Sequence, residues 1–159
     1  MQAAIHDQET EIALPGLDAV ARLGTAIAAR LQPGDAVALR GDLGAGKTTL
    51  ARAILTALGH VGEVPSPTFT LVQSYELPQL DVAHLDLYRL KQPEEIVELG
   101  FDDALAQGAA LIEWPEMAED FMPGERLDVV LSAEPERRAA LAGHGRWAAL
   151  APVIASEAA

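Results

Sequence analysis

Residues 41–48 combine glycines, a lysine and a threonine in a spacing that could bind phosphate. They match the pattern G-x-x-x-x-G-K-[ST], with Gly41, Asp42, Leu43, Gly44, Ala45, Gly46, Lys47 and Thr48. Glycines let such a loop wrap a phosphate closely and turn its backbone N–H groups inward. Lys47 would reach the β- and γ-phosphates, and the Thr48 hydroxyl would ligate Mg²⁺. The pattern predicts binding of a nucleoside triphosphate, and an ordinary glycine-rich turn is the alternative.

Two acidic residues could complete such a site, because each follows an apolar run. Asp86 directly follows residues 82–85, and Glu113 directly follows residues 109–112. Nucleotide hydrolysis usually needs a carboxylate at the end of a neighbouring strand to hold Mg²⁺. The pattern favours Glu113, since its fully apolar strand is expected to lie centrally beside the loop strand. For either residue, the alternative is a solvated acid at the end of a strand.

Further candidates lie in two short segments. The hydroxyl-rich, proline-braced segment 66–70 could place Thr68 against the γ-phosphate or Mg²⁺ as a switch segment does, or could be a turn into a strand. Trp114 directly follows Glu113, so it would lie near the pocket or a partner surface, unless it belongs to the core. The histidines are scattered without the spacing of metal ligands, so no chemistry is assigned to them. They are His6, His60, His84 and His144.

The elements that must position these residues follow from hydrophobic periodicity. Residues 36–39 form a buried-type strand that runs into the loop, and a helix is expected from Lys47 to Leu58, ended by Gly59. Another helix is expected at 17–31, and one opens at Pro93. Further strands are expected at 11–14, 71–75, 82–87, 109–112 and 127–131. Residues 137–145 fit either a helix or an edge strand. We predict a P-loop NTPase-like three-layer α/β/α fold with a mostly parallel or mixed sheet.

Length and composition limit the remaining possibilities. The 159 residues suffice for one well-buried core, so we predict a single P-loop ATPase domain over 1–159. Its alanine-rich tail from about 148 is expected to form a terminal helix that frays into solvent. The net charge of −13 disfavours broad binding to DNA or RNA. Cysteine is absent, and so is any apolar stretch of membrane-spanning length. We expect a soluble, cytoplasmic protein without a membrane partner.

Motif absences narrow the function. No Asn-Lys-x-Asp segment exists to read guanine, which disfavours a GTPase of the Ras type. A small-molecule kinase is expected to carry an arginine-rich lid, and the pair Arg137-Arg138 is thin support for one. ATP hydrolysis is the favoured activity. A metabolite kinase and a nucleotide-gated binding module without relevant hydrolysis are the alternatives.

The chain resembles the TsaE (YjeE) family of small bacterial ATPases, which are needed for threonylcarbamoyladenosine modification of tRNA. Four blocks carry the resemblance, in order and at family-like separations. They are Gly41 to Leu50, which includes Thr49; Ser66 to Val72; His84 to Leu90; and Ile112 to Glu116. The phosphate loop alone is shared by very many proteins, so the other three blocks make the match specific.

The resemblance implies an ATPase that works with the TsaB and TsaD proteins, regulating or resetting their complex, while tRNA is handled by those partners. Its cofactors would be ATP and Mg²⁺, and its unassisted activity would be weak. By matching position, Lys47 and Thr48 bind phosphate and Mg²⁺, and both Asp86 and Glu113 lie near the metal. Thr68 lies in a switch-like segment and Trp114 beside the γ-phosphate. Adenine contacts would fall around residues 14–18.

Overall fold

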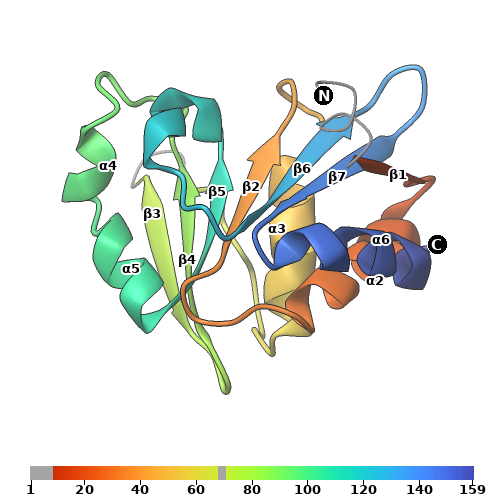
Figure 1. Ribbon diagram of the computed structural model, residues 1–159, viewed down its shortest axis with the longest axis horizontal. Coiled ribbons are helices and arrows are strands. Elements are labelled where there is room, and N and C mark those ends of the chain that lie inside the picture. The colour runs from red at the N-terminus through yellow and green to blue at the C-terminus, as the bar shows by residue number, and fades with distance from the viewer. Residues whose placement is uncertain (1–8, 68–70) are drawn as a thin grey trace.

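A mixed seven-stranded sheet runs through the protein (Figure 1). The computed structural model describes residues 9–67 and 71–159. The strands are β1 (Thr10–Ala13), β2 (Ala36–Arg40), β3 (Val72–Glu76), β4 (Asp81–Asp86), β5 (Gly108–Glu113), β6 (Arg126–Ser132) and β7 (Arg138–His144). Their order in space is β1-β7-β6-β2-β5-β4-β3, with β4, β5, β2 and β6 parallel and the other pairings antiparallel. Four strands therefore end at one edge of the sheet.

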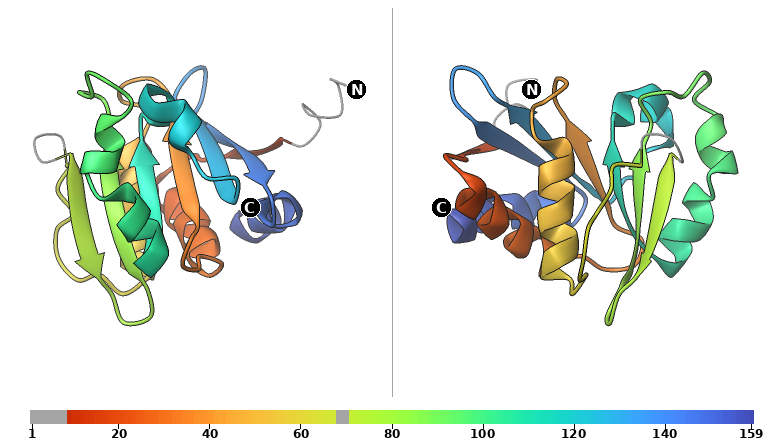
Figure 2. Two further views of the ribbon diagram at one scale, coloured as in Figure 1. Left: turned by 60° about the vertical axis from the view of Figure 1, so that its left-hand side comes forward. Right: turned by 180° about the vertical axis from the view of Figure 1, so that it is seen from behind.

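Helices cover both faces of this sheet (Figures 1 and 2). One layer holds α2 (Leu17–Ala28), α3 (Lys47–Ala57) and α6 (Trp147–Ala158), and the other holds α4 (Glu95–Glu98), α5 (Phe101–Gln107) and the 3₁₀ segment η1 (Pro115–Phe121). Each layer packs on its own hydrophobic core. The predicted three-layer α/β/α fold with a mixed sheet is confirmed. Among the described residues, no helix is long and apolar enough to span a membrane.

The strand that leads into the glycine loop lies at the centre of the sheet, as its apolar sequence predicts. Residues 36–39 of β2 are fully buried, because β5 and β6 flank the strand and helices cover both of its faces. The expectation that the apolar run 109–112 lies beside the loop strand is also confirmed, since β5 pairs directly with β2. This pairing brings the end of β5 next to the start of the loop.

The C-terminal segment is an ordered helix, which corrects the prediction that it frays into solvent. Five residues of α6 are buried against the core, namely Trp147, Ala151, Ile154, Ala155 and Ala158. Trp147 Nε1 donates a hydrogen bond of 3.0 Å to the buried carboxylate of Asp35, which also accepts one from Arg146. Small alanines let this helix approach α2 and β7 closely, so the composition reflects packing rather than disorder.

Residues 138–144, which the sequence left open between helix and edge strand, form β7. This strand is not at an edge, because it pairs with β6 on one side and with β1 on the other. Gly143 leaves no room for a side chain, since a Cβ there would lie 2.0 Å from the carbonyl oxygen of Trp147. The close approach of α6 to the end of β7 therefore requires glycine at this position.

Arg40, the last residue of β2, ties the start of the glycine loop to its surroundings. Its guanidinium donates to Asp128 on β6 at 3.0 Å and to both carboxylate oxygens of Glu119 in η1, at 2.7 and 2.9 Å. Asp128 is buried and also accepts from Arg126 at 3.1 Å, while His144 Nε2 lies 2.7 Å from its other oxygen. Burial alone would raise the pKa of Asp128, but the hydrogen bonds from Arg126 and Arg40 and their charges lower it below its usual range.

We expect Asp128→Asn to lower the free energy of unfolding by about 2 kcal/mol at neutral pH, because two arginines lose a charged acceptor. A carboxyl group whose folded-state pKa is lowered stabilises the fold above its unfolded pKa, and this stabilisation is lost as the pH falls through the folded value. The difference in the free energy of unfolding between the variant and the unaltered protein should therefore shrink below about pH 4. Urea unfolding across this range measures it, with the exposed Asp120→Asn as control. A deficit that stays constant with pH would contradict this explanation.

Candidate functional site

The glycine loop lies at the edge of the sheet where the parallel strands end, between β2 and α3 (Figure 1). Gly41, Gly44 and Gly46 all have positive φ, at 140°, 83° and 108°. A Cβ on Gly41 would lie only 2.4 Å from the carbonyl oxygen of Leu131 on β6. The backbone thus adopts conformations that side chains at these positions would oppose. The remaining loop positions, Asp42, Leu43 and Ala45, complete a curve that ends at the N-terminus of α3.

Lys47, the first residue of α3, points back over the loop that precedes it. Its Nζ donates to the carbonyl oxygens of Gly41 at 2.5 Å and Asp42 at 3.0 Å. The same ammonium lies 4.1 Å from the ring centroid of Trp114. The residue is 5% exposed, and burial lowers the pKa of Lys47 despite the nearby carboxylates. Lys47 therefore places a desolvated positive charge at the mouth of the loop.

Thr48 contacts the predicted acid of β5 directly. Its hydroxyl lies 2.9 Å from both carboxylate oxygens of Glu113, which is 3% exposed. This contact arises because Glu113 ends β5 opposite Leu39, the residue before the last of β2, so the strand ends beside the helix that carries Thr48. The motif hydroxyl and the carboxylate therefore form one polar pair.

Asp86 ends the next parallel strand and lies in register with Glu113. It is 6% exposed, and its Oδ1 accepts a hydrogen bond of 3.1 Å from the backbone N–H of Tyr88. Burial raises the pKa of Asp86, and the charge of Glu113 adds to the rise. The apolar pattern favours Glu113 over Asp86, and the resemblance keeps both acids; the structure brings both to the same edge of the sheet.

The oxygen atoms gathered here suit a hard divalent cation. The Thr48 hydroxyl and the carboxylates of Asp86 and Glu113 are the ligand types that Mg²⁺ prefers. Across residues 9–67 and 71–159, no group of three or more His, Cys, Asp or Glu side chains could hold a metal ion by itself. Mg²⁺ usually keeps waters and binds through one or two carboxylates together with substrate phosphates, so Thr48, Asp86 and Glu113 would hold it together with a bound nucleotide.

The backbone turns sharply at Trp114, directly after β5, and the side chain of this residue bounds the site on one side. Its φ of 59° is unusual for a large side chain, so the surrounding structure must hold it there. Its ring lies 4.8 Å from that of Tyr88 and faces Lys47. A cavity of about 370 Å³ opens at this point, lined by Leu43, Gly44, Gly46, Lys47, Thr48, Thr49, Ser66, Asp86, Tyr88, Arg89, Glu113 and Trp114. Trp114 thus lines this cavity and also packs against the hydrophobic core on its face of the sheet.

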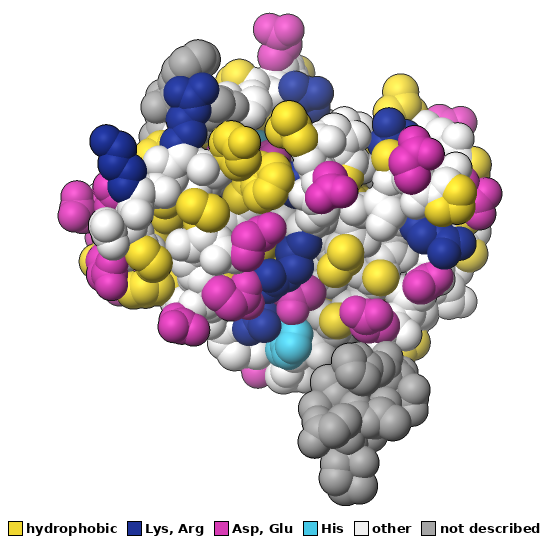
Figure 3. Space-filling model, turned by 90° about the horizontal axis from the view of Figure 1, so that it is seen from above, with side chains coloured by type: hydrophobic (Ala, Val, Ile, Leu, Met, Phe, Trp, Pro, Cys, Tyr) yellow, Lys and Arg dark blue, Asp and Glu magenta, His cyan; other side chains and the backbone are white. Residues whose placement is uncertain are grey.

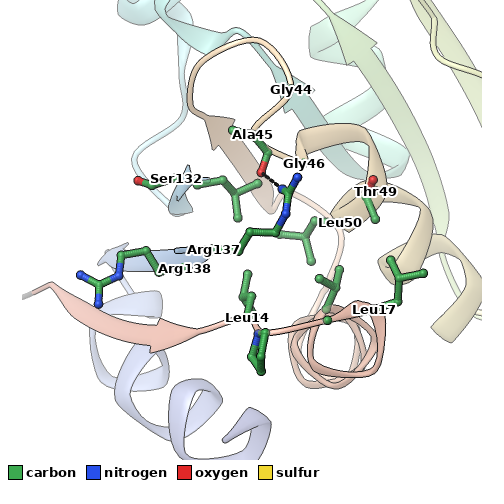
Figure 4. A pocket seen from close by; sticks show the side chains of 14 residues that line it. Leu14, Leu17, Gly44, Ala45, Gly46, Thr49, Leu50, Ser132, Arg137 and Arg138 are labelled. Carbon is green, nitrogen blue, oxygen red and sulfur yellow. Dashed lines mark hydrogen bonds between the residues drawn. The ribbon is translucent and has the colours of Figure 1, made fainter. Parts of the chain in front are cut away.

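A second cavity of about 300 Å³ lies on the other side of the loop (Figure 4). Its walls are the connection from β1 to α2, the loop at 44–46, the first turn of α3 and the hairpin between β6 and β7. Arg137 from that hairpin points toward the loop, and its Nη1 lies 3.4 Å from the carbonyl oxygen of Ala45. Leu14, Leu17 and Leu50 give this cavity an apolar floor. The segment 14–18, where adenine contacts would fall, is therefore adjacent to the loop.

The sequence assigns no chemistry to His84 and does not predict the contact that this residue makes. His84 is fully buried, and its Nε2 lies 2.7 Å from Oε2 of Glu113. A signal existed, since His84 precedes Asp86 by two residues and alternation along a strand directs both to one face. Thr68, by contrast, lies outside the described residues, so its role stays a prediction. Its neighbour Ser66 lines the cavity beside Lys47.

Comparison with known proteins identifies the family of this chain. Residues 14–140 match the family model described as "Threonylcarbamoyl adenosine biosynthesis protein TsaE". The chain is similar to a tRNA threonylcarbamoyladenosine biosynthesis protein TsaE from Rickettsia bellii, at 46% identity over 67% of this chain and 74% of the relative. The TsaE protein from Bacillus subtilis is 41% identical over 71% of this chain and 69% of the relative. The crystal structure of B. subtilis YdiB superposes with a TM-score of 0.71, at 31% identity and 93% coverage of both chains. The chain therefore belongs to the TsaE family.

Proposed function

We propose that this protein is a Mg²⁺-dependent ATPase that serves threonylcarbamoyladenosine modification of tRNA by binding and regulating or resetting a TsaB–TsaD complex. The observation that carries the ATPase part is the contact of Thr48 with Glu113 beneath Lys47, at the end of a glycine loop. Membership in the TsaE family supports the biosynthetic role. The acidic surface supports a division of labour in which the partners handle the tRNA.

The described residues suggest how a triphosphate would be held. Lys47 would exchange the carbonyl oxygens of Gly41 and Asp42 for β- and γ-phosphate oxygens, while backbone N–H groups of the loop and the first turn of α3 donate to the same phosphates. Thr48, Asp86 and Glu113 would hold Mg²⁺ directly or through water. The cation would neutralise charge that develops on the transferred phosphoryl group.

The cavity beside Arg137 is the proposed position of the nucleoside. It adjoins the loop at 44–46 and the first turn of α3, so a nucleotide could lie with its phosphates on one side of the loop and its base on the other. Leu14, Leu17 and Leu50 would supply apolar surface for a base, and Arg137 would supply a positive charge to a phosphate held by the loop. This arrangement supports a nucleotide rather than free phosphate as the ligand.

Product analysis distinguishes hydrolysis from transfer to a metabolite. Incubation of the protein with Mg-ATP and a metabolite extract should yield only ADP and free phosphate, with no phosphorylated metabolite. A phosphorylated product would favour a P-loop kinase instead. Absence of cleavage, even in a single turnover with TsaB and TsaD present, would leave a binding module that responds to nucleotide without hydrolysing it.

Exposed apolar side chains around the phosphate cavity support a partner surface at this edge. Leu43 at the tip of the loop is 81% exposed, and Tyr88 is 53% exposed. Figure 3, which looks onto the edge where the parallel strands end, shows hydrophobic side chains gathered among scattered acidic ones. A partner that covers Leu43 would also exclude water from the phosphates and would sense whether nucleotide is present.

We therefore expect Leu43→Ser to weaken capture of the protein by TsaB and TsaD in a pull-down. Loss of a central apolar contact costs roughly 1–2 kcal/mol, or about tenfold in affinity. Val61→Ser is the matched control, because Val61 is 92% exposed and lies beyond the far end of α3. The pull-down should be repeated with ATP, with ADP and without nucleotide. Equal capture of both variants in all three conditions would contradict a partner surface at the loop.

A further inference from the structure

His84 occupies an unusual position for a residue without an assigned role. It lies on β4, where it is 0% exposed, and its Nε2 is 2.7 Å from Oε2 of Glu113. A carboxylate oxygen only accepts hydrogen bonds, so Nε2 carries the proton and donates. The other ring nitrogen, Nδ1, is also buried and has no hydrogen-bond partner within the described part of the chain. Among the described residues, Glu113 is thus the one polar partner of this imidazole.

Stability alone does not account for a histidine at this position. Burying a polar ring with one nitrogen unpaired costs free energy that an apolar side chain of similar size would avoid. The neighbours along the strands, Val82 and Leu111, are apolar and buried, so a leucine would suit the surroundings of His84. The cost is offset only if the hydrogen bond to Glu113 contributes something other than packing.

The contribution follows from the geometry of Glu113. The terminal torsion of a glutamate joins sp³ and sp² carbons and is soft, so an untethered carboxylate turns over a broad range. Here Oε2 is held by His84, and the Thr48 hydroxyl lies 2.9 Å from both oxygens. A donor from the core therefore fixes the plane of the carboxylate before any ligand binds, and this plane determines how Glu113 faces the Thr48 hydroxyl.

We propose that His84 is a positioning residue that orients Glu113 toward Thr48 for the binding of the Mg-nucleotide. The inference rests on the proposed function, since it assigns a role within the same site. His84 touches neither phosphate nor cation in this account, and it acts only through Glu113. Hydrogen-bond partners that orient a ligating carboxylate typically change metal affinity or activity by about 10–100-fold when they are removed.

The first test compares ADP affinity by calorimetry in Mg²⁺ and in EDTA. In His84→Leu, the Mg²⁺ concentration needed to tighten ADP binding should rise by about tenfold or more, while ADP affinity in EDTA stays unchanged. His84→Gln should restore most of the response, because its amide can still donate to Glu113. Leu111→Ala, beside His84 on the neighbouring strand, should lower thermal stability without changing the response to Mg²⁺.

A double variant tests whether His84 acts through Glu113. When Glu113→Gln is already present, His84→Leu should cause little further change in the Mg²⁺ response, because the oriented carboxylate is gone. A full additional loss would contradict an action of His84 through Glu113.

Imidazole ¹⁵N spectra of the unaltered protein give a measurement that needs neither metal nor variant. They should report the tautomer protonated at Nε2, and protonation at Nδ1 alone would overturn the inference.

The outcomes separate this inference from the proposed function. Mg²⁺ should tighten ADP binding by the unaltered protein. If His84→Leu needs no more Mg²⁺ than the unaltered protein for the same tightening, His84 has only a structural role and the inference is overturned. If the unaltered protein shows no nucleotide binding under any condition, the proposed function fails and the inference fails with it.

Discussion

Replacement of Lys47 by alanine is expected to reduce ATP turnover by about two to three orders of magnitude, which corresponds to roughly 3–4 kcal/mol of transition-state stabilisation. The side chain lies at the mouth of the loop, where the residue is 5% exposed and burial already lowers its pKa. Such a charge acts strongly on a phosphate, because little water must be displaced when the phosphate arrives. ATP affinity should fall as well, since the β- and γ-phosphates lose their one lysine contact and keep only backbone N–H groups and the cation.

The same variant should keep its fold in the absence of nucleotide. Burial lowers the pKa of Lys47, so removing the charge relieves a cost, while the hydrogen bonds to Gly41 and Asp42 are lost. These effects oppose each other, and the thermal midpoint of nucleotide-free Lys47→Ala should stay close to that of the unaltered protein. Lys91→Ala is the natural control, because Lys91 is exposed and is the other lysine of the sequence. Inactivity accompanied by a lowered midpoint would indicate damage to the fold rather than loss of a phosphate contact.

Glu113→Gln is expected to have the second largest effect, a loss of about 100-fold in turnover. Glutamine keeps the size of the side chain and can still accept a hydrogen bond from His84 or Thr48, but it lacks the negative charge that a nearby Mg²⁺ requires. Binding of ADP in EDTA should persist, because the loop and Lys47 are unchanged. The effect on turnover should therefore greatly exceed the effect on metal-free nucleotide binding.

Steady-state turnover and calorimetry on the same preparation measure this difference. Glu98→Gln, at an exposed position on α4, should behave like the unaltered protein in both measurements. Equal losses of turnover and of ADP binding in EDTA would show that Glu113 supports the loop itself and would remove it from the set of Mg²⁺ ligands.

The positions of the glycine loop and of Glu113 could be predicted because their signals are local. Three glycines, Lys47 and Thr48 follow one apolar strand directly, and Glu113 follows another, so short stretches of sequence were sufficient. Whether Asp86 joined Glu113 depended on strand order, which those stretches do not contain. The register that pairs β4 with β5 brings the two acids together.

Other features depend on contacts between distant segments and escaped prediction for that reason. The helix α6 looked like a fraying tail because its alanines resemble a solvent-exposed low-complexity segment, yet its position is fixed by Asp35, far away in the sequence. His84 showed no ligand spacing, since its partner Glu113 lies 29 residues further on. β7 stayed ambiguous because its alanines favour a helix and its glycine favours neither element, so the strand is decided by the pairing with β1 and β6.

The central claim is that ATP turnover at this loop serves a partner complex, and one titration tests it most directly. Steady-state hydrolysis of Mg-ATP should be measured while cognate TsaB and TsaD are added together, with Lys47→Ala in parallel to show that the turnover belongs to this chain. We predict slow turnover by the protein alone and a rise that saturates as the complex forms, with no rise for Lys47→Ala. Turnover that stays unchanged across the full titration would contradict the account.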